Sequence, residues 1–534
     1  MPCALTALGL ALYLPFLGNP LVFDDPFFFS GRNFARYATT PLGLELRLPG
    51  YFSLAFVEVV WGGIRKHRLV SLALHLAVCL TLYKLIVDLL RQAAPSAPPR
   101  LAAFGAAAAF ALHPVAVYGA GYLIQRTGLL ATLFGLLSML LFLRGAARQS
   151  HADALSGAAL FSLAVLSKET AVLVPAAAVS GLLVFRAERK FAVRHAAIYL
   201  AACAPAGVLA ALLVKGKIGA TYEPDFGTVA SQVGDAVVNV AGSPWLTSVA
   251  TQLQLFFRYL GLWLLPDTSA MSIDVRVEFA AGAGALIALV AFIAYAAGCA
   301  YLLLRGGRPA MAGFGLLYVW IVFLVELSTV RFADPFVLYR SYLWAPGLAI
   351  AGAAVLWRKW LQVSLLAALP LLAAQAHDRL ESFSSGLAVW QDAVDKLPEE
   401  PIAGGSRTLY QLGREYFYGG EPGKALATVD RCIAQYPQTY DCHFARAAIH
   451  VELEQYEAAL PYIRRASELR PESGSARHLL GFALESLGEV EEAKAHYRTA
   501  LKLGFPGAVY RLQRLEEPGK GLLPPTRSAA PRRD

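Results

Sequence analysis

FAAGAGALIALVAFIAYAAGCAYLLL (Phe279–Leu304) decides the class of this protein, because none of its 26 consecutive residues carries a charged side chain. About 20 apolar residues are enough to cross the hydrocarbon core of a bilayer as a helix. Ten further runs are long enough to cross or nearly cross it, although several are short. We therefore predict an all-α, polytopic membrane domain of about eleven spans over residues 1–377. The other runs are Cys3–Leu17, Leu69–Leu90, Leu101–Gly119, Thr127–Arg144, Ala152–Leu166, Ala171–Arg186, His195–Val214, Met311–Glu326, Tyr342–Trp357 and Leu361–Ala376.

The composition of the 534-residue chain supports this class. Hydrophobic residues make up 57% and charged residues 16%, against about 45–50% and about 25% in soluble domains. The net charge of +9 does not indicate nucleic-acid binding, because the basic residues gather at the ends of apolar runs. The first run lacks the basic flank and small-residue site of a cleaved signal, so we expect it to remain as an anchor.

Charge also predicts the topology. With the N-terminus in the cytoplasm, every inside loop holds at least two basic residues, while acids collect outside. The first outside loop, residues 18–67, holds basic residues as well, which favours an anionic ligand there. We expect Thr251–Pro266 to pack near the outer face without crossing, so the C-terminal part lies outside. The inside loops carry Arg91 and Arg100; Arg144 and Arg148; Arg186, Arg189, Lys190 and Arg194; Arg305 and Arg308; Arg358 and Lys359.

The charged C-terminal part contains an internal repeat. Small residues and prolines recur every 34 or 35 residues, and this spacing resembles the tetratricopeptide repeat (TPR). Residues 378–515 are therefore predicted to form a TPR solenoid that binds a protein partner, with Ser382–Lys396 beginning the array. A role in capping or dimerisation stays open. Residues 516–534 are predicted to be a disordered basic tail. The recurring residues are Gly413, Ala447 and Gly481; Ala425, Ala459 and Ala493; Pro437, Pro471 and Pro506.

Two of the six cysteines lie in this repeat. Cys432 is near the end of one predicted helix and Cys442 is in the next, so antiparallel packing could bring them together. A disulfide between them is a candidate if the repeat lies in an oxidising compartment. Sequence alone leaves its geometry open.

Asp24 and Asp25 are the leading candidates for catalysis. They follow the first apolar run in Leu21–Pro26, at the mouth of the membrane domain. Ionisable groups in such a place are a functional-site hypothesis by default. The alternative is a solvated loop with an Asp-Pro turn. Paired carboxylates also suit a divalent metal, although two alone do not establish a site.

Further polar residues interrupt or flank apolar runs near the same outer face. Each has a simple structural explanation, such as helix packing for His75 or contact with lipid phosphate for Arg126. Their convergence instead indicates a site for a lipid-linked sugar phosphate. Basic groups would neutralise the phosphate, and a carboxylate would remove the acceptor's hydroxyl proton. The candidates are Arg47, Arg68, His75, His113, Arg126, Lys168, Glu169, Glu326 and Arg340.

Phe23-Asp24-Asp25, with Asn33 following, resembles the first-loop acidic motif of the C-type glycosyltransferases. The order of further motifs resembles more closely the transmembrane-and-TPR-containing O-mannosyltransferases and their bacterial relatives. Ser71, Leu48 and Val117-Tyr118 depart from that pattern, which bears on the sugar and the donor contacts. The motifs are Arg47–Pro49, His67–His75, Leu112–Pro114, Gln125–Phe134, Ser167–Thr170, Thr251–Leu260, Leu265–Pro266 and Tyr339–Leu343.

The resemblance implies transfer of a sugar from a polyprenyl-phosphate donor to hydroxyl groups of proteins on the non-cytoplasmic side. It places the catalytic acid in the Asp24/Asp25 pair, where Asp25 is the preferred residue. The Ala-, Leu- and Arg-rich composition suggests a high-GC bacterium, hence undecaprenyl phosphate as carrier, the inner membrane as location, a periplasmic TPR domain, and pilin or another exported protein as acceptor.

The chemistry of such a transfer predicts roles for the other residues. Arg126, Lys168 and Arg340 would bind the phosphate, supported by His75 and His113. Arg47 and Arg68 would gate the donor, while Glu169 and Glu326 would orient the basic groups or contact the sugar. Two other functions stay open, namely a glycosyltransferase acting on a lipid or cell-wall glycan, and a non-catalytic TPR scaffold for secretion or pilus assembly.

Overall fold

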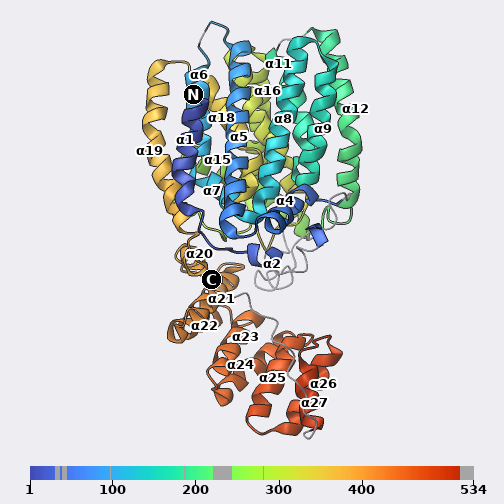
Figure 1. Ribbon diagram of the computed structural model, residues 1–534, viewed down its shortest axis with the longest axis vertical. Helices are drawn as coiled ribbons and strands as arrows, with labels where there is room; N and C mark the ends of the chain where they lie inside the picture. The colour runs from blue at the N-terminus through green and yellow to red at the C-terminus, as the bar shows by residue number, and fades with distance from the viewer. Residues whose placement is uncertain are drawn as a thin grey trace. The chain divides into compact units, whose positions relative to one another are not determined.

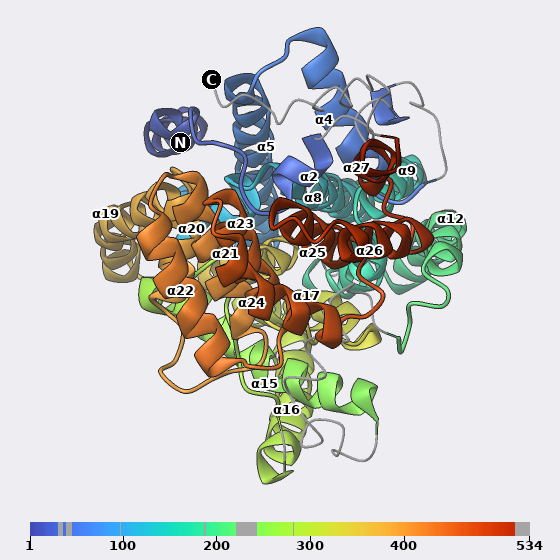
Figure 2. The ribbon, with the colours of Figure 1, turned by 90° about the horizontal axis from the view of Figure 1, so that it is seen from below.

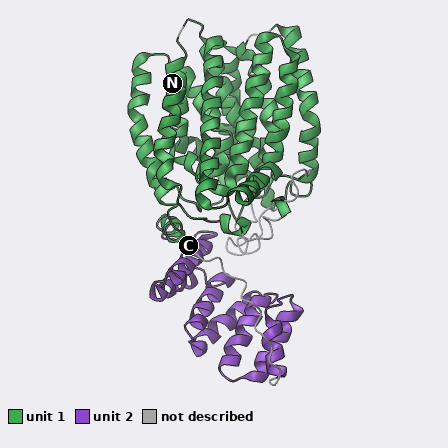
Figure 3. Ribbon diagram, viewed as in Figure 1, with its two compact units in different colours: residues 1–227, 234–396 green, residues 228–233, 397–534 purple. Residues whose placement is uncertain are grey.

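The computed structural model describes residues 1–29, 36–38, 45–96, 98–185, 188–220, 243–280 and 282–517. These residues form two compact units, one ending at Lys396 and the other beginning at Leu397 (Figure 3). Among them the secondary structure is helical, apart from one isolated antiparallel bridge between Val275 and Phe336. Asn33, Arg186 and the predicted tail from residue 518 onward lie outside the described residues.

The first unit is a bundle whose helices run mostly along one direction (Figure 1). Its helices are α1 (Pro2–Tyr13), η1 (Leu14–Phe16), α2 (Asp25–Phe29), α4 (Leu48–Val60), α5 (Ile64–Ala93), α6 (Arg100–Ala111), α7 (Pro114–Ala120), η2 (Leu123–Gln125), α8 (Arg126–Arg148), α9 (His151–Ser167), η3 (Glu169–Leu173), α10 (Val174–Ser180), α11 (Leu182–Phe185), α12 (Arg189–Leu213), α15 (Pro244–Leu264), η4 (Thr268–Ala270), α16 (Gly282–Leu304), α17 (Gly307–Phe323), η5 (Leu324–Ser328), η6 (Leu338–Leu343), α18 (Pro346–Val355), α19 (Lys359–Glu381) and α20 (Gly386–Val394).

Within the described ranges, six helical segments are long and apolar enough to cross a membrane, and α6 with α7 adds a seventh if that pair is one span bent by 65°. Proline cannot continue the hydrogen-bond ladder, and the His113 side chain accepts the Val115 N–H to begin α7 anew. The prediction of about eleven spans is not confirmed. The remaining four predicted runs are helical but shorter: Pro2–Phe16, His151–Ser167, Glu169–Phe185 and Pro346–Val355.

Burial separates an inner from an outer set of these helices. The most apolar stretches of α5 and of η2–α8 are 61% and 72% buried, whereas those of α12, α16 and α19 are only 17%, 22% and 11% buried. The latter three lie at the periphery of the bundle (Figure 2). Their outward faces are apolar, with Ile287 67% and Val363 62% exposed. Soluble proteins rarely expose so much apolar surface, so several of these helices could span a membrane.

The second unit consists of antiparallel helix pairs. The small residues of the 34-residue period lie where paired helices meet. A Cβ atom on Gly413 would lie 2.7 Å from Val429 Cγ2, and one on Gly481 would lie 2.9 Å from Tyr497 Cε1. Ala425, Val429, Ala447 and Ile463 are buried between the helices. The helices are α21 (Gly405–Tyr418), α22 (Pro422–Gln435), α23 (Tyr440–Glu452), α24 (Tyr456–Leu469), α25 (Gly474–Ser486), α26 (Val490–Lys502) and α27 (Ala508–Glu516).

The sequence predicted the boundary between the units after residue 377. In the structure the boundary comes later, after Lys396. The helical piece Ser382–Lys396, expected to begin the repeat, contains α20 and belongs to the first unit. Ionic contacts explain this. Arg379 on α19 pairs with Asp392, and both Arg379 and Lys396 donate hydrogen bonds to the Met271 carbonyl.

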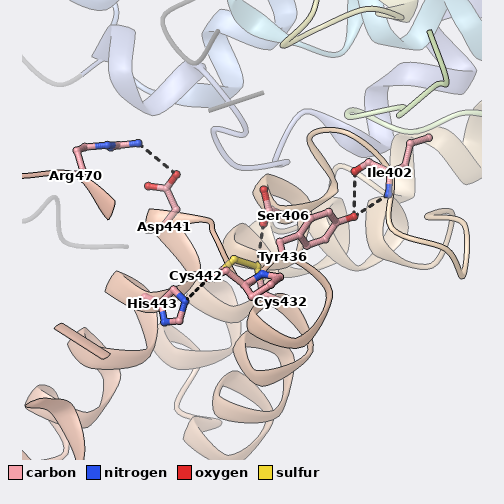
Figure 4. Close-up of a disulfide and its surroundings, with 9 residues drawn as sticks. Ile402, Ser406, Cys432, Tyr436, Asp441, Cys442, His443 and Arg470 are labelled. Atoms are coloured by element: carbon pink, nitrogen blue, oxygen red, sulfur yellow. Dashed lines mark hydrogen bonds and ion pairs between the residues drawn. A yellow bond between two sulfur atoms is a disulfide. The ribbon is translucent and has the colours of Figure 1, made fainter. Parts of the chain in front are cut away.

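Cys432 on α22 and Cys442 on α23 form a disulfide with their Cα atoms 5.8 Å apart (Figure 4). This separation lies within the usual range for such bonds. Nearby, the Tyr436 hydroxyl accepts a hydrogen bond from the Ile402 N–H and donates one to the Ile402 carbonyl. The disulfide therefore joins two consecutive helix pairs at a point where the chain is already well packed.

Candidate functional site

The two adjacent aspartates have different surroundings. Asp25, at the start of α2, is fully buried, and its carboxylate accepts hydrogen bonds from the Ile124 N–H at 2.9 Å and the Val22 N–H at 3.4 Å. Asp24 is exposed, and its N–H donates to the Tyr122 hydroxyl at 3.0 Å. The left-handed backbone of Phe23 (φ 54°) forms a tight turn before them. Asp25 thus fixes the loop to η2, and Asp24 is the accessible carboxylate.

Burial raises the pKa of the Asp25 carboxyl to about 7, although the charge of Arg68 and the hydrogen bonds from Ile124 and Val22 oppose this shift. Unfolding returns the pKa to about 3.9. The neutral acid therefore favours the folded state, and its contribution is complete below about pH 4 and is lost as the pH rises through 7.

We expect the thermal stability of the purified protein to fall from pH 5 to pH 8 more steeply than that of the Asp25→Asn variant. Asparagine keeps an oxygen for the Ile124 N–H but cannot ionise. Unfolding midpoints across this range measure the difference, with Asp24→Asn as the matched control because that side chain is exposed. Equal slopes in the wild type and Asp25→Asn would show that Asp25 does not titrate in this range.

Arg47 and Glu169 tie α4 to the break between α9 and η3. Arg47 donates two hydrogen bonds to the Glu169 carboxylate, at 3.1 and 2.5 Å. Its backbone is left-handed (φ 66°), and its N–H donates to the Leu166 carbonyl at 2.7 Å. A two-point arginine–carboxylate contact fixes orientation as well as distance, so the pair holds the start of α4 in place.

Lys168 occupies that same break and is partly exposed. Its Nζ donates to Gln125 Oε1 at 2.9 Å and lies 5.1 Å from the centre of the Tyr339 ring. The charges of Arg47, Glu169, Glu326 and Arg340 act on it. Lys168 therefore lies among its neighbour Glu169 and charged groups from three other places in the sequence.

Glu326 on η5 forms ion pairs with two arginines. Arg331 Nη2 lies 3.4 Å and Arg340 Nη1 lies 3.8 Å from Glu326 Oε2. All three side chains are about nine-tenths buried, at 6%, 11% and 10% exposure. Arg331 was not among the site residues predicted from the sequence, although its place beside Asp334 in the loop after η5 was a usable signal. Arg340 Nη1 also donates a hydrogen bond to the Asp334 carbonyl at 2.9 Å.

Aromatic rings connect these charges to Asp24. The Tyr122 ring, whose hydroxyl accepts from the Asp24 N–H, lies 5.8 Å from the Tyr339 ring. The charge of Asp24 acts on both tyrosines, and Lys168 lies over Tyr339. We call this group the charged cluster. Its members are Asp24, Arg47, Lys168, Glu169, Glu326, Arg331 and Arg340.

The arginines Arg68 and Arg126, predicted to contact the donor, are instead engaged inside the bundle. Arg68 donates to the carbonyls of Asn19, Pro20 and Gly121 at 2.5–2.7 Å. Arg126 is fully buried and donates to Ser71 Oγ and to the carbonyls of Ser53 and His67. Since each nitrogen of both guanidinium groups already has an acceptor, these arginines hold helix ends together rather than face the charged cluster.

The two candidate histidines are also internal. His75 is fully buried, and its Nε2 donates to the Ala111 carbonyl at 3.2 Å, so its Nδ1 accepts from the Tyr342 hydroxyl at 2.6 Å. His113 caps α7 and stacks on Trp263 with ring centres 4.3 Å apart. The structure therefore separates the predicted site residues into the charged cluster and an inner set of Arg68, His75, His113 and Arg126.

The paired carboxylates of Asp24 and Asp25 led to the hypothesis of a divalent metal site. Over the part of the chain that the structure describes, no group of three or more His, Cys, Asp or Glu residues is placed to hold a metal ion. Asp25 is buried and its carboxylate accepts two backbone N–H groups, whereas Asp24 is exposed. A metal requirement stays a hypothesis drawn from sequence.

Comparison with known families identifies the C-terminal repeats. Residues 440–473 and 474–503 match the tetratricopeptide repeat family. These ranges coincide with the helix pairs α23–α24 and α25–α26. The C-terminal part of the chain therefore contains TPR repeats, which generally mediate protein–protein interaction.

Proposed function

We propose that this chain is a membrane glycosyltransferase that moves a sugar from a polyprenyl-phosphate donor to hydroxyl groups of exported proteins. The charged cluster carries this proposal. Within it the charge of the exposed Asp24 acts on Tyr339, and Lys168 Nζ lies 5.1 Å from the centre of the Tyr339 ring. Ionisable groups at the end of an apolar bundle are costly to keep, which favours a function for them.

The basic members of the cluster suit the donor's phosphate. Lys168 and Arg340 act on one another electrostatically, and burial lowers the pKa of the Lys168 ammonium to about 7, which Glu169 and Glu326 oppose. A lysine presents a compact charge to phosphate, and an arginine adds a planar pair of donors. With Arg331 they would stabilise the departing polyprenyl phosphate while its hydrocarbon chain stays in the bilayer.

Asp24 would act as the general base. It takes the proton of the acceptor hydroxyl as that oxygen forms a bond to the anomeric carbon of the sugar. The bond between this carbon and the phosphate oxygen breaks, and its electron pair leaves with the polyprenyl phosphate. Asp25 positions Asp24 through the hydrogen bonds to Ile124 and Val22. This division of roles differs from the sequence-based preference for Asp25 as the base.

The TPR repeats would recruit the acceptor, such as pilin or another exported protein. The Cys432–Cys442 disulfide supports a location outside the cytoplasm, because structural disulfides persist in oxidising compartments. Together with the distribution of basic loops, this favours an inner-membrane protein with a cytoplasmic N-terminus and periplasmic repeats.

A non-catalytic scaffold for secretion or pilus assembly is the main rival. The TPR match is equally expected of a scaffold, and a lipid or cell-wall glycan is an alternative acceptor. A scaffold does not need the charged cluster, so the cluster favours catalysis over this rival.

The deciding experiment measures the intact mass of exported proteins from three strains. One strain carries the normal gene and one carries a gene deletion. The third carries a truncated gene whose product ends at Lys396, the last residue of the first unit. We expect a hexose- or pentose-sized mass to be lost in the deletion strain. The truncated protein should fail to modify proteins but still hydrolyse the donor slowly. Unchanged exported proteins in the deletion strain would contradict protein glycosylation, leaving a glycan acceptor or a scaffold.

A further inference from the structure

A second polar site lies at the opposite end of the first unit. A cavity of about 350 Å³ opens between the last turns of α5 and α8 and the end of α11, at the upper end of the bundle in Figure 1. Arg144 in this cavity lies 19 residues along the η2–α8 segment from Gln125, which accepts a hydrogen bond from Lys168 of the charged cluster, a distance of about 28 Å in a helix. The cavity is therefore separate from the charged cluster. It is lined by Lys84, Asp88, Arg91, Gln92, Arg144, Ala147, Arg148 and Phe185.

The cavity is strongly basic. It contains four cationic side chains and one carboxylate. Asp88 fixes Arg144 through contacts of 2.6 and 2.7 Å, and Arg91 lies farther from it at 3.6 Å. Lys84, Arg91 and Arg148 remain exposed. Asp88 therefore contacts two of the arginines and balances one of the four positive charges that line the cavity.

Basic residues in the last turn of a helix often only offset the helix dipole. The four cations and one carboxylate leave three excess positive charges in the cavity. The C-terminal end of each helix carries about half a negative charge, so α5 and α8 together offset about one of these three. A substantial positive charge remains. The cavity volume of about 350 Å³ lies within the range of about 300–1,000 Å³ that is usual for small-molecule sites.

We propose that this cavity binds the phosphate group of an anionic membrane lipid. The ends of membrane-length helices lie at the level of the lipid headgroups, where basic residues attract anionic lipids. Arginine side chains suit phosphate oxygens because they present two parallel donors. Phe185 and Ala147 supply an apolar wall for the first carbons of the lipid. Inorganic phosphate carries the same anionic group as the lipid headgroup, so the cavity could bind it as well.

The test counts phosphatidylglycerol molecules retained by the purified full-length protein in nonionic detergent, by native mass spectrometry. The variant is Arg91→Gln/Arg148→Gln, which leaves the Asp88–Arg144 pair intact. We expect its retention to fall about tenfold, since each basic residue near a lipid surface contributes appreciably. The control is Arg358→Gln/Lys359→Gln, which removes the same charge from exposed residues outside the cavity and should retain lipid as the wild type does.

A parallel titration with inorganic phosphate distinguishes the two sources. If phosphatidylglycerol is retained and millimolar phosphate does not displace it, the ligand is a lipid headgroup. If phosphate binds and phosphatidylglycerol does not, the cavity is an anion site for a soluble ligand and the lipid assignment is wrong. Equal lipid retention by the wild type and Arg91→Gln/Arg148→Gln, with no phosphate binding, would overturn the proposal altogether.

Discussion

Replacing Asp24 with Asn should abolish sugar transfer while leaving the protein in the membrane at its normal level. Loss of a general base typically lowers the rate by about 10²–10⁴-fold. Because Asp24 is exposed, the substitution should change the free energy of unfolding by no more than about 0.5 kcal/mol. The measurement is the transfer rate from a polyprenyl-phosphate donor in isolated membranes, normalised to the amount of the protein.

Asp25→Asn is the matched control for this prediction. The asparagine oxygen can still accept the Ile124 N–H, so the loop should keep its position and transfer should fall by less than about tenfold. If Asp25→Asn abolishes transfer and Asp24→Asn does not, the two roles are exchanged. If neither variant affects transfer, the general base lies elsewhere in the chain.

The helices of the membrane domain were largely predictable, because apolar runs of this length have few alternatives to helix. The α4 helix was missed: Pro49 and Gly50 open it and charged residues flank it, so Leu48–Val60 reads as part of a loop. The number of spans was not predictable in the same way. Whether a short helix such as α9 or α18 crosses a membrane depends on packing and tilt, which the local sequence does not encode.

The TPR repeats were predictable because their signal is a packing requirement. Gly413 and Gly481 recur at the same repeat position since any side chain there would meet Val429 or Tyr497 of the paired helix. The start of the array was not predictable. Asp392 on α20 pairs with Arg379 on α19, and a pairing of this kind leaves no periodic trace in the sequence.

For the candidate site, the sequence predicted which polar residues lie near one face of the membrane domain. It did not predict which of them belong to the charged cluster and which are engaged inside the bundle. Asp24 and Asp25 are adjacent, yet the buried Asp25 carboxylate accepts a hydrogen bond from the Ile124 N–H, 99 residues away, while Asp24 is exposed. Likewise Arg126 and Lys168 both interrupt apolar sequence. The carbonyls of Ser53 and His67 engage Arg126, and only the tertiary structure reveals this.

Donor binding should depend on Lys168 and not on Arg126. Lys168→Gln should raise the KM for the polyprenyl-phosphate sugar by about 10–100-fold, because a hydrogen bond to a charged group is worth about 1.5–3 kcal/mol. Its fold should persist, since Lys168 is partly exposed and Gln125 can pair with the new amide. Donor titrations in membranes measure the change.

Arg126→Gln should behave in the opposite way. The fully buried Arg126 donates to three acceptors on two other parts of the bundle. A shorter amide leaves some of these unsatisfied, at about 1–3 kcal/mol for each group. The amount of folded protein and its unfolding temperature should fall, while the surviving protein should keep a nearly normal KM for the donor. A stable Arg126→Gln variant with a raised KM would instead place the phosphate at Arg126, as the sequence-based prediction did. It would mean that the donor displaces the internal carbonyl contacts when it binds.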